Sequence, residues 1–397
     1  MKIGILTFHA AHNYGAVLQA YGLQEFLKSR GHAVEVVDYR PDYLTRHYQV
    51  IPRWRVNKKH GVFANTLRLG YYCARILPAA ILRAPMRVRR ARGFENFISG
   101  ALNLSRERFK EGGRVPAENY DALVFGSDQI WSPNHTDGGD PVFLGDFPVP
   151  SGTLKIAYAA SAGAASATLG ENPIFANALK NFDALSVREE NLAESLRPRT
   201  EKEIETVLDP TLLAERDVWE KLARTPRAMP KKYVLVYQVM FNPEADRIAA
   251  ELAAQIGAEV VSVWAGYVGR GNMRKTETPA EFVGWFKNAA CVVSTSFHGT
   301  AFSLIFEKPF YYVGKGEAAE NRPRQILGAL GLMSRYVSPS AHPVFSEIDY
   351  GSVNAKNKWG GGMDSRGEAL SAAERLLALR ERSAAFLDRA LALRKTA

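Results

Sequence analysis

The segment around residue 298 combines a proton-transferring side chain with a site suited to an anion. His298 follows an apolar stretch, residues 291–296, that predicts a strand, and it precedes a predicted helix. Free amides and the dipole at a helix N-terminus favour a phosphate or carboxylate, and Gly299 lets a ligand approach the backbone. Imidazole can supply a proton near neutral pH, although the dipole disfavours imidazolium until an anion binds. We predict that His298 is catalytic and that Ser296, Gly299 and Thr300 contact the ligand; a histidine that only caps the turn is the alternative.

Two polar residues, Asp128 and Gln129, follow another predicted strand at residues 121–125. Small residues separate them from the strand, so their side chains would lie at its carboxyl end. A base and a hydrogen-bond donor in this position can meet the hydroxyl groups of a ligand. We predict these roles for Asp128 and Gln129. Asp128 could instead cap a following helix, and Trp131 could contact the ligand or belong to the core.

Several basic residues could bind a carboxylate or a phosphate. Arg188 ends a predicted strand at residues 184–187, and its planar guanidinium can bind a carboxylate through two hydrogen bonds. Arg322, Arg324 and Lys315 lie in the segment after the last predicted strand. We predict that Arg188 and Arg322 contact the ligand, and we interpret Lys315 and Arg324 as surface residues.

The first predicted strand–helix turn carries Asn13, Tyr14 and Gly15. We predict that Asn13 and Tyr14 line the ligand site, because this turn lies at the carboxyl end of its strand. His9 and His12 flank the turn, and we interpret them as loop histidines with local hydrogen bonds.

These residues require a scaffold of alternating strands and helices. Strand-like stretches lie at residues 3–8, 33–38, 121–125, 154–160, 184–187 and 204–208, with helical patterns between them. This alternation is typical of βαβ units and parallel sheets. After a proline-rich linker at residues 224–232, it resumes with strands at 233–240, 258–264, 291–296 and 309–313.

We therefore predict an α/β protein of two Rossmann-like, doubly wound domains. Their bounds are residues 1–223 and 233–345, and residues 346–397 form a C-terminal loop and helix. Ligands of such folds bind at the carboxyl ends of the strands, so the cleft between the two sheets is the expected site.

The positive charge of the chain is concentrated in one segment. Net charge is +10, and residues 43–93 hold twelve of the 51 Lys and Arg residues but no Asp or Glu. Within this segment an apolar stretch, residues 67–82, precedes a basic cluster of Arg83, Arg87, Arg89, Arg90 and Arg92. This combination suits an anionic membrane surface, where each basic residue contributes about 1 kcal/mol. A solvated basic surface is the alternative, and no motif indicates nucleic-acid binding.

Other classes of protein are disfavoured. Cys73 and Cys291 have no metal-binding spacing, so we expect neither a zinc site nor a disulfide framework. No stretch resembles a signal-peptide core or a transmembrane helix. We expect a cytoplasmic protein that binds the inner face of the plasma membrane peripherally and uses no cofactor.

Four segments together resemble the polysaccharide pyruvyl transferase family. They are TFHAAHNYGAVLQAYGLQ (7–24), FGSDQIWSP (125–133), YAAS (158–161) with SVRE (186–189) and LDPTLL (208–213), and STSFHGTAFSLIFEKPF (294–310). They occur in the family's order. The resemblance implies a fold like that of two-domain, B-type glycosyltransferases, with the acceptor on the first domain, the donor on the second, and no metal.

The resemblance also implies phosphoenolpyruvate as donor and, as acceptor, a sugar that is often carried on a lipid diphosphate. Many relatives have an arginine two residues before the histidine, where this chain has Ser296, so other basic residues must meet the donor's charge. Two alternatives remain: a glycosyltransferase using a nucleotide sugar, and a non-catalytic scaffold for glycan assembly. A nicotinamide-dependent dehydrogenase is excluded, because the first turn lacks the G-x-G-x-x-G pattern.

Overall fold

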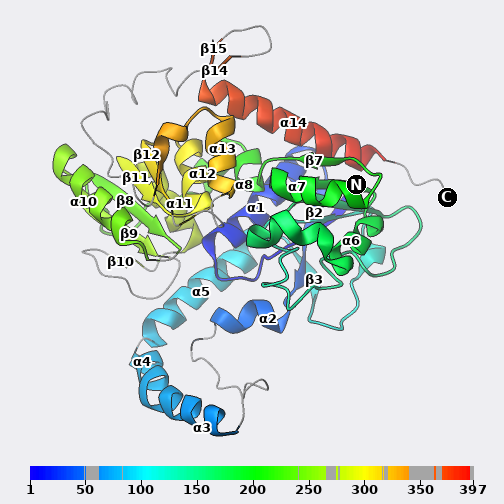
Figure 1. Cartoon of the computed structure of the whole chain (residues 1–397), viewed down its shortest axis with the longest axis horizontal. Helices are drawn as coiled ribbons and strands as arrows, with labels where there is room; N and C mark the ends of the chain where they lie inside the picture. Colours follow the sequence, from blue (N-terminus) through cyan, green and yellow to red (C-terminus); the bar gives the residue numbers. More distant parts are fainter. Residues whose placement is uncertain are drawn as a thin grey trace.

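Two α/β domains lie side by side in the computed structural model, and a long C-terminal helix runs along one edge of both (Figure 1). The structure describes residues 1–48, 50, 62–82, 84–239, 241–264, 274–275, 278–314, 316, 321–338, 362–363 and 369–393. The predictions for Lys315 and Arg83, and for most of the loop from 346 to 371, lie outside these residues.

The first domain is built on a seven-stranded sheet in the order β3-β2-β1-β4-β5-β6-β7, with parallel pairing throughout. Its strands are β1 (Lys2–Leu6), β2 (Ala33–Tyr39), β3 (Leu104–Phe109), β4 (Ala122–Phe125), β5 (Leu154–Ala160), β6 (Ala184–Val187) and β7 (Ile204–Thr206). Its helices are α1 (Tyr14–Ser29), α2 (Asp42–Thr45), α3 (Val62–Tyr71), α4 (Leu77–Leu82), α5 (Ala84–Ala101), α6 (Pro173–Ala178), α7 (Glu190–Leu196), α8 (Pro210–Leu213) and α9 (Arg216–Leu222). Every residue of β4 and β5 is buried, as expected for central strands of a parallel sheet covered on both faces.

The second domain contains a six-stranded sheet in the order β10-β9-β8-β11-β12-β13, again with parallel pairing. Its strands are β8 (Tyr233–Gln238), β9 (Glu259–Trp264), β10 (Arg274–Lys275), β11 (Cys291–Ser294), β12 (Phe310–Val313) and β13 (Tyr336–Val337). Its helices are α10 (Pro243–Ile256), α11 (Pro279–Asn288), α12 (Phe297–Ile305) and α13 (Asn321–Ala329). Two doubly wound, Rossmann-like domains were predicted from the sequence, and the topology confirms them.

The C-terminal helix α14 (Ala372–Ala392) follows the short antiparallel pair β14 (Gly362–Met363) and β15 (Ala369–Leu370). It packs back onto the first domain, where Ser383 Oγ accepts a hydrogen bond from the Leu208 amide and Arg380 donates to the Leu212 carbonyl. The helix therefore lies beside the segment that carries the LDPTLL motif.

The helix after β11 starts earlier than the sequence indicated. We expected a strand to Ser296 and a helix from Gly299, but β11 ends at Ser294 and α12 begins at Phe297. Ser294 explains the early end, because its hydroxyl donates to the Tyr237 carbonyl and accepts the Ser296 amide. His298 consequently lies within the first turn of α12 rather than in front of it.

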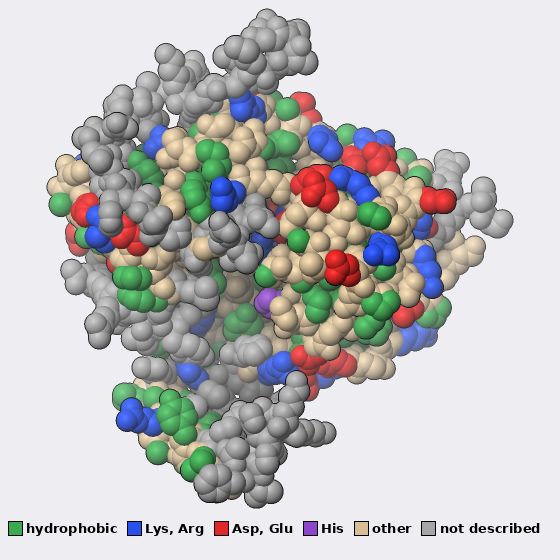
Figure 2. Space-filling view, in the orientation of Figure 1, with side chains coloured by type: hydrophobic (Ala, Val, Ile, Leu, Met, Phe, Trp, Pro, Cys, Tyr) green, Lys and Arg blue, Asp and Glu red, His purple; other side chains and the backbone are tan. Residues whose placement is uncertain are grey.

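Helices α3, α4 and α5, with a π-helical turn (Tyr72–Ile76) between the first two, form a projection that we call the arm, residues 62–92 (Figure 1). Its helices and strand β3 after it were not predicted, since this part of the sequence was interpreted only by charge and hydropathy. Six of the thirteen exposed large apolar side chains in the described chain lie on it, namely Leu67, Leu69, Tyr71, Ile81, Leu82 and Met86. Figure 2 shows hydrophobic side chains beside basic ones on this projection. Among the helices that the structure describes, none is both long and apolar enough to cross a membrane.

Candidate active site at the domain boundary

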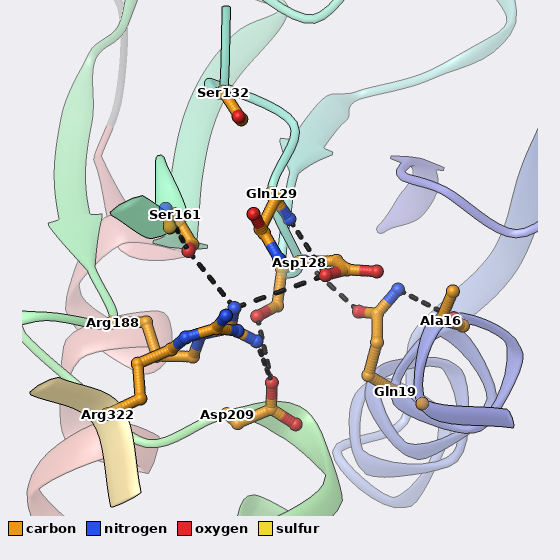
Figure 3. Close-up of polar contacts among 12 residues, drawn as sticks. Ala16, Gln19, Asp128, Gln129, Ser132, Ser161, Arg188, Asp209 and Arg322 are labelled. Carbon is orange, nitrogen blue, oxygen red and sulfur yellow. Dashed lines mark hydrogen bonds and ion pairs between the residues drawn. The ribbon is translucent and has the colours of Figure 1, made fainter. Parts of the chain in front are cut away.

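The first wall of the site consists of residues that follow three adjacent strands, β4, β5 and β6. Asp128 follows β4, Ser161 follows β5, and Arg188 follows β6. Because parallel strands present their carboxyl ends at one edge, these three side chains converge (Figure 3). The structure thus brings together Asp128 and Arg188, which were both predicted to contact the ligand.

Arg188 is buried at the centre of this cluster, with 2% of its side-chain surface exposed. Its Nη1 donates to Asp209 Oδ2 at 2.6 Å, its Nη2 donates to Ser161 Oγ at 3.0 Å, and its Nε lies 3.4 Å from Glu189 Oε1. Asp128 Oδ1 is 4.0 Å from Nη2. Burial opposes the charged form, but the surrounding carboxylates outweigh it and raise the pKa of Arg188. The guanidinium is therefore a permanent positive charge.

Arg322 reaches the same cluster from the second domain, near the start of α13. Figure 3 shows the Arg188 and Arg322 side chains approaching the same point between Ser161, Asp128 and Asp209. Arg322 Nε lies 3.4 Å from Glu189 Oε1, and its side chain is 20% exposed. Burial and the neighbouring Arg188 lower the pKa of Arg322. This strain between like charges would be relieved by an anion bound between them.

Asp209 holds Arg188 in place within the cluster. It is the N-cap of α8, and its Oδ1 accepts hydrogen bonds from the Thr211 amide at 2.9 Å and hydroxyl at 2.6 Å. Its Oδ2 receives Arg188 and lies 3.2 Å from Ser127 Oγ. Burial would raise the pKa of Asp209, but Arg188, His298 and the Thr211 hydrogen bonds lower it to about 2. Asp209 is thus ionised at neutral pH.

His298 brings the only imidazole that the described residues place against this cluster. Its Nε2 lies 3.9 Å from Asp209 Oδ2, has no hydrogen-bond partner among the described residues, and is buried. Burial lowers the pKa of His298, and Arg188 and Arg322 lower it further against the opposing effect of Asp209 and Asp128. Among these residues the imidazole is therefore neutral at pH 7, and a nitrogen without a hydrogen-bond partner among the described residues faces the cluster.

A cavity of about 70 Å³ opens beside Asp209 and Phe297. Arg188 lines it from the segment after β6, Arg322 from α13 and Arg382 from α14, so three positively charged side chains from distant segments share one space. Its remaining walls are Gln325, Thr206, Ser383 and apolar side chains such as Leu212 and Ile326. A water molecule occupies about 30 Å³ of liquid, so the cavity admits a larger group. Arginines around such a space favour an anion with carboxylate or phosphate oxygens.

The other predicted residues on the second domain lie around His298, and their contacts mainly fix the backbone at the start of α12. Ser296 is the N-cap of α12 and is buried, and Thr300 Oγ1 lies 3.4 Å from the Ser296 carbonyl. At Gly299, a Cβ atom would lie 2.0 Å from Ser294 Oγ, so only glycine fits there. Arg324 lies over the Tyr336 ring, 5.2 Å from its centroid, away from the cluster.

On the first domain, Asn13 caps α1 by accepting the Gly15 amide, and Tyr14 is fully buried against Phe282, with ring centroids 4.2 Å apart. Gln129 packs its amide onto Gly163, where a Cβ would lie 2.1 Å from Oε1.

The remaining aromatic and histidine residues of these segments have structural partners. Trp131 is a core residue whose indole donates to the Phe143 carbonyl. His9 contacts Asp38 at 2.9 Å and His12 contacts Glu95 at 3.0 Å, which agrees with their interpretation as loop histidines.

Sequence reasoning missed four members of the site: Ser161, Glu189, Asp209 and Arg382. The first three lie inside the motifs YAAS, SVRE and LDPTLL, so the motifs themselves were the available signal. Glu189 is 1% exposed, and its Oε2 has no hydrogen-bond partner in the described part of the chain. Asp128, expected to cap a helix if not catalytic, precedes no helix; it accepts the Gln129 amide and has a φ of 64°.

Comparison with known proteins gives one family. The model of the polysaccharide pyruvyl transferase family matches residues 13–315, and none of the curated proteins compared by sequence matches the chain. Among solved structures, similarity is found to UDP-GlcNAc 2-epimerase of Methanocaldococcus jannaschii, with 11% identity, 85% of this chain and 88% of that one covered, and a TM-score of 0.44. The E. coli ADP-heptose LPS heptosyltransferase II has 11% identity, coverages of 96% and 99%, and a TM-score of 0.39. The Streptomyces sp. SF2575 glycosyltransferase SsfS6 has 15% identity, coverages of 98% and 96%, and a TM-score of 0.38.

Proposed function

The chain belongs to the polysaccharide pyruvyl transferase family, and we propose that it transfers the pyruvyl group of phosphoenolpyruvate to a sugar of a surface polysaccharide or its lipid-linked precursor, forming a pyruvate ketal. The observation that carries this proposal is the cavity lined by Arg188, Arg322 and Arg382. Phosphoenolpyruvate has a carboxylate and a phosphate, and guanidinium groups bind both through paired hydrogen bonds. These arginines are the candidates to replace the one absent at Ser296.

The chemistry requires one proton at carbon and two sugar hydroxyls at the same centre. In the proposed reaction His298 delivers a proton to the methylene carbon, which becomes the methyl group, and positive charge develops on the neighbouring carbon. One sugar hydroxyl adds to that carbon as Asp128 takes its proton. The bond from carbon to the phosphate oxygen then breaks, inorganic phosphate leaves, and the second hydroxyl closes the ketal. Of the two hydroxyl protons, one replaces the proton used at carbon and the other leaves on phosphate.

The electrostatics of His298 fit a ligand-dependent acid. Burial and two arginines lower the pKa of His298 and keep it neutral at pH 7. A bound trianion would pair with Arg188 and Arg322 and place negative charge near the imidazole, so it would raise that pKa. The histidine would then become an acid only when the donor is present, which limits unproductive protonation.

The direct test is incubation with phosphoenolpyruvate and a panel of sugar acceptors, free and lipid-linked. Phosphate release together with the mass gain of a pyruvyl ketal on the acceptor is the expected result. Nucleotide sugars in parallel reactions test a glycosyltransferase, the alternative on this fold. Glycosyl transfer without pyruvyl transfer would replace the proposal, and no transfer from either donor would favour a non-catalytic scaffold.

We further propose that the arm holds the enzyme at an anionic membrane surface, at the inner face of the plasma membrane, where lipid-linked acceptors would be met. Supporting this, the arm exposes six large apolar side chains, among them Leu67 and Leu82, which are 61% and 82% exposed. Arg75, Arg89 and Arg92 are exposed on the same projection, and no acidic residue occurs between residues 43 and 93. Apolar side chains that enter the headgroup region beside basic ones are typical of interfacial helices.

A further inference from the structure

A second hollow lies on the first domain, apart from the arginine-lined cavity. Its volume is about 700 Å³, within the range of ligand sites, and it is lined by the end of β2, by α2, by the loop after β3 and by the loop before β5. Tyr39 and Tyr43 form its floor together with Asp140. None of its lining residues belongs to the cluster around Arg188.

The floor is a fixed polar unit. Tyr39 donates its phenol hydrogen to Asp140 Oδ2 at 2.6 Å, Tyr43 donates to the same oxygen, and Asp140 Oδ1 accepts the Val142 amide at 2.8 Å. Burial and the Asp140 carboxylate raise the pKa of both tyrosines, so they stay neutral. Because both phenol hydrogens are used on Asp140, the phenol oxygens can only accept further hydrogen bonds. The floor therefore suits a ligand that donates hydroxyl hydrogens.

The walls determine the charge of the ligand. Besides Asp140, the acidic residues Glu111, Glu118, Asp137 and Asp146 line the hollow. Glu118 pairs with Arg114 and Asp137 with Arg46, so the remaining balance of charge is acidic. Phosphate, nucleotide and phosphoenolpyruvate would be repelled by this balance. The rest of the lining is mainly apolar, with Phe147, Val115, Val142, Val149 and three prolines. Apolar and aromatic surface combined with carboxylate acceptors matches a neutral sugar, which has a hydrophobic face and hydroxyl donors.

The hollow shares an edge with the site of Asp128. Tyr39 ends β2 and Asp128 follows β4, and β1 alone separates these two strands in the sheet. Two strand spacings correspond to about 10 Å. The segment after Gln129 also continues into the wall of the hollow, where Thr136 Oγ1 donates to the Ser132 carbonyl. A chain of sugars whose reacting unit lies at Asp128 can therefore extend along this edge.

We propose that this hollow is a second acceptor subsite, which binds a neutral sugar unit of the glycan next to the unit that is pyruvylated. The proposal rests on the proposed function, and it adds a determinant of acceptor length and identity. It makes the enzyme selective for an oligosaccharide over a single sugar. The donor would be unaffected, because it binds in a different, positively charged cavity.

The test uses the whole chain and two substitutions of lining residues. Val149→Trp fills the hollow, and Asp146→Arg changes its charge; Val149 is half-buried and Asp146 is exposed, so both variants should fold. Leu377→Trp on α14 and Glu194→Arg on α7 are exposed matched controls outside the hollow. Saturation-transfer NMR with neutral oligosaccharides, from disaccharide to pentasaccharide, measures binding without the donor.

For wild type and controls we expect saturation transfer to neutral oligosaccharides that increases with oligosaccharide length, and in Val149→Trp and Asp146→Arg we expect this dependence on length to be lost. In transfer assays both variants should raise the acceptor KM for oligosaccharides by about tenfold, with KM for a monosaccharide acceptor and for phosphoenolpyruvate unchanged. Oligosaccharide affinity equal to that of wild type in both variants would overturn the subsite. The subsite would also be overturned if no neutral oligosaccharide binds the wild-type protein although the protein transfers pyruvyl groups to another acceptor. Absence of any pyruvyl transfer, with oligosaccharide binding intact, would instead reject the proposed function.

Discussion

Gly15 of the first domain lies directly against the ring of His298 of the second. A Cβ atom added at residue 15 would lie 2.2 Å from His298 Nδ1 and 2.4 Å from Cε1, well inside any real contact. Both residues occupy the first turn of a helix, α1 and α12 respectively. The missing side chain of Gly15 is therefore what allows the imidazole to reach Asp209 across the domain boundary.

We expect Gly15→Ala to lower turnover by about 10²-fold or more, since the added methyl must displace the imidazole and misplace a proton donor. Alanine favours helix over glycine by about 1 kcal/mol, which offsets part of the steric destabilisation. The measurements are turnover and melting temperature. Gly100→Ala is the matched control, because Gly100 is also helical and a Cβ there meets nothing within 4 Å. Normal turnover in Gly15→Ala would show that the imidazole position is not critical.

How much of this site could be predicted depends on what each residue signals locally. Arg188 and Asp128 follow buried strands, and parallel topology alone brings such positions together. Asp209 signals something else: Asp followed by Pro predicts an N-cap, which it is, and nothing local indicates that its second oxygen binds Arg188. Arg382 lies on α14, a helix whose sequence alternates apolar and charged residues as surface helices do. It lines the cavity only because α14 packs against the first domain.

The elements themselves were predicted best where patterns are strong. Strands β5 and β6 have the predicted bounds. The arm was missed because residues 62–82 were interpreted only by hydropathy and charge, and because the segment lacks the capping residues that mark helix ends. The start of α12 was misplaced because the side-chain hydrogen bonds of Ser294, which end the strand, are not visible in hydropathy.

The second prediction concerns pH and His298. Its folded pKa lies below the usual 6.5, so the unfolded chain binds the proton more readily. Stability should therefore be unaffected by this group above pH 6.5 and should fall as pH drops through 6.5 toward the lower folded pKa. His298→Gln should remove this loss. The stability of the variant minus that of wild type should therefore be larger at about pH 5 than at about pH 8. Melting temperatures at the two pH values provide the measurement.

In activity, His298→Gln should reduce turnover by about 10²- to 10⁴-fold, the usual contribution of a proton donor. The wild-type kcat/KM should decline as pH rises through the lowered pKa, because the acid form is lost, and the variant should lack this decline. A variant within threefold of wild type, roughly 0.7 kcal/mol, would remove His298 from the mechanism.

Asp209→Asn should destabilise the protein strongly. The substitution removes one charge of a fully buried pair and leaves the Arg188 guanidinium partly uncompensated, which typically costs about 3–5 kcal/mol. Urea unfolding measures the change. Asp217→Asn is the control, because Asp217 forms an exposed pair with Lys221 one helical turn away, and it should change stability little. Equal effects of the two substitutions would contradict the assignment of Asp209 as the anchor of the cluster.

Substitution by lysine should have different effects at Arg322 and at Arg188. Arg322→Lys keeps the charge but loses the planar pair of donors, so KM for phosphoenolpyruvate should rise about tenfold with little change in acceptor KM. Arg188→Lys should also weaken donor use, and it should lower the melting temperature as well, because Arg188 uses three nitrogens on Asp209, Ser161 and Glu189. A larger rise in acceptor KM than in donor KM would assign the residue to the sugar side.

The last prediction concerns the arm and an anionic surface. The protein should co-sediment with anionic liposomes at low salt and detach at high salt. Salt screens the attraction between the basic residues and the lipid headgroups, and the Debye length is already only about 8 Å at physiological ionic strength. It should ignore neutral liposomes, since each basic residue contributes only about 1 kcal/mol near an anionic surface and the apolar side chains alone do not anchor the protein.

The structure decides which arginines to replace. Arg90 donates to the His12 carbonyl and lies over the rings of Tyr14 and Phe94, so its loss would disturb the turn that leads to Gly15. The informative variant therefore changes Arg75, Arg89 and Arg92 to Gln and leaves Arg90 in place. It should lose sedimentation yet keep wild-type turnover on a short water-soluble acceptor. Loss of that turnover would place these arginines in the substrate path, and wild-type protein that ignores anionic liposomes at low salt would reduce the arm to a solvated surface.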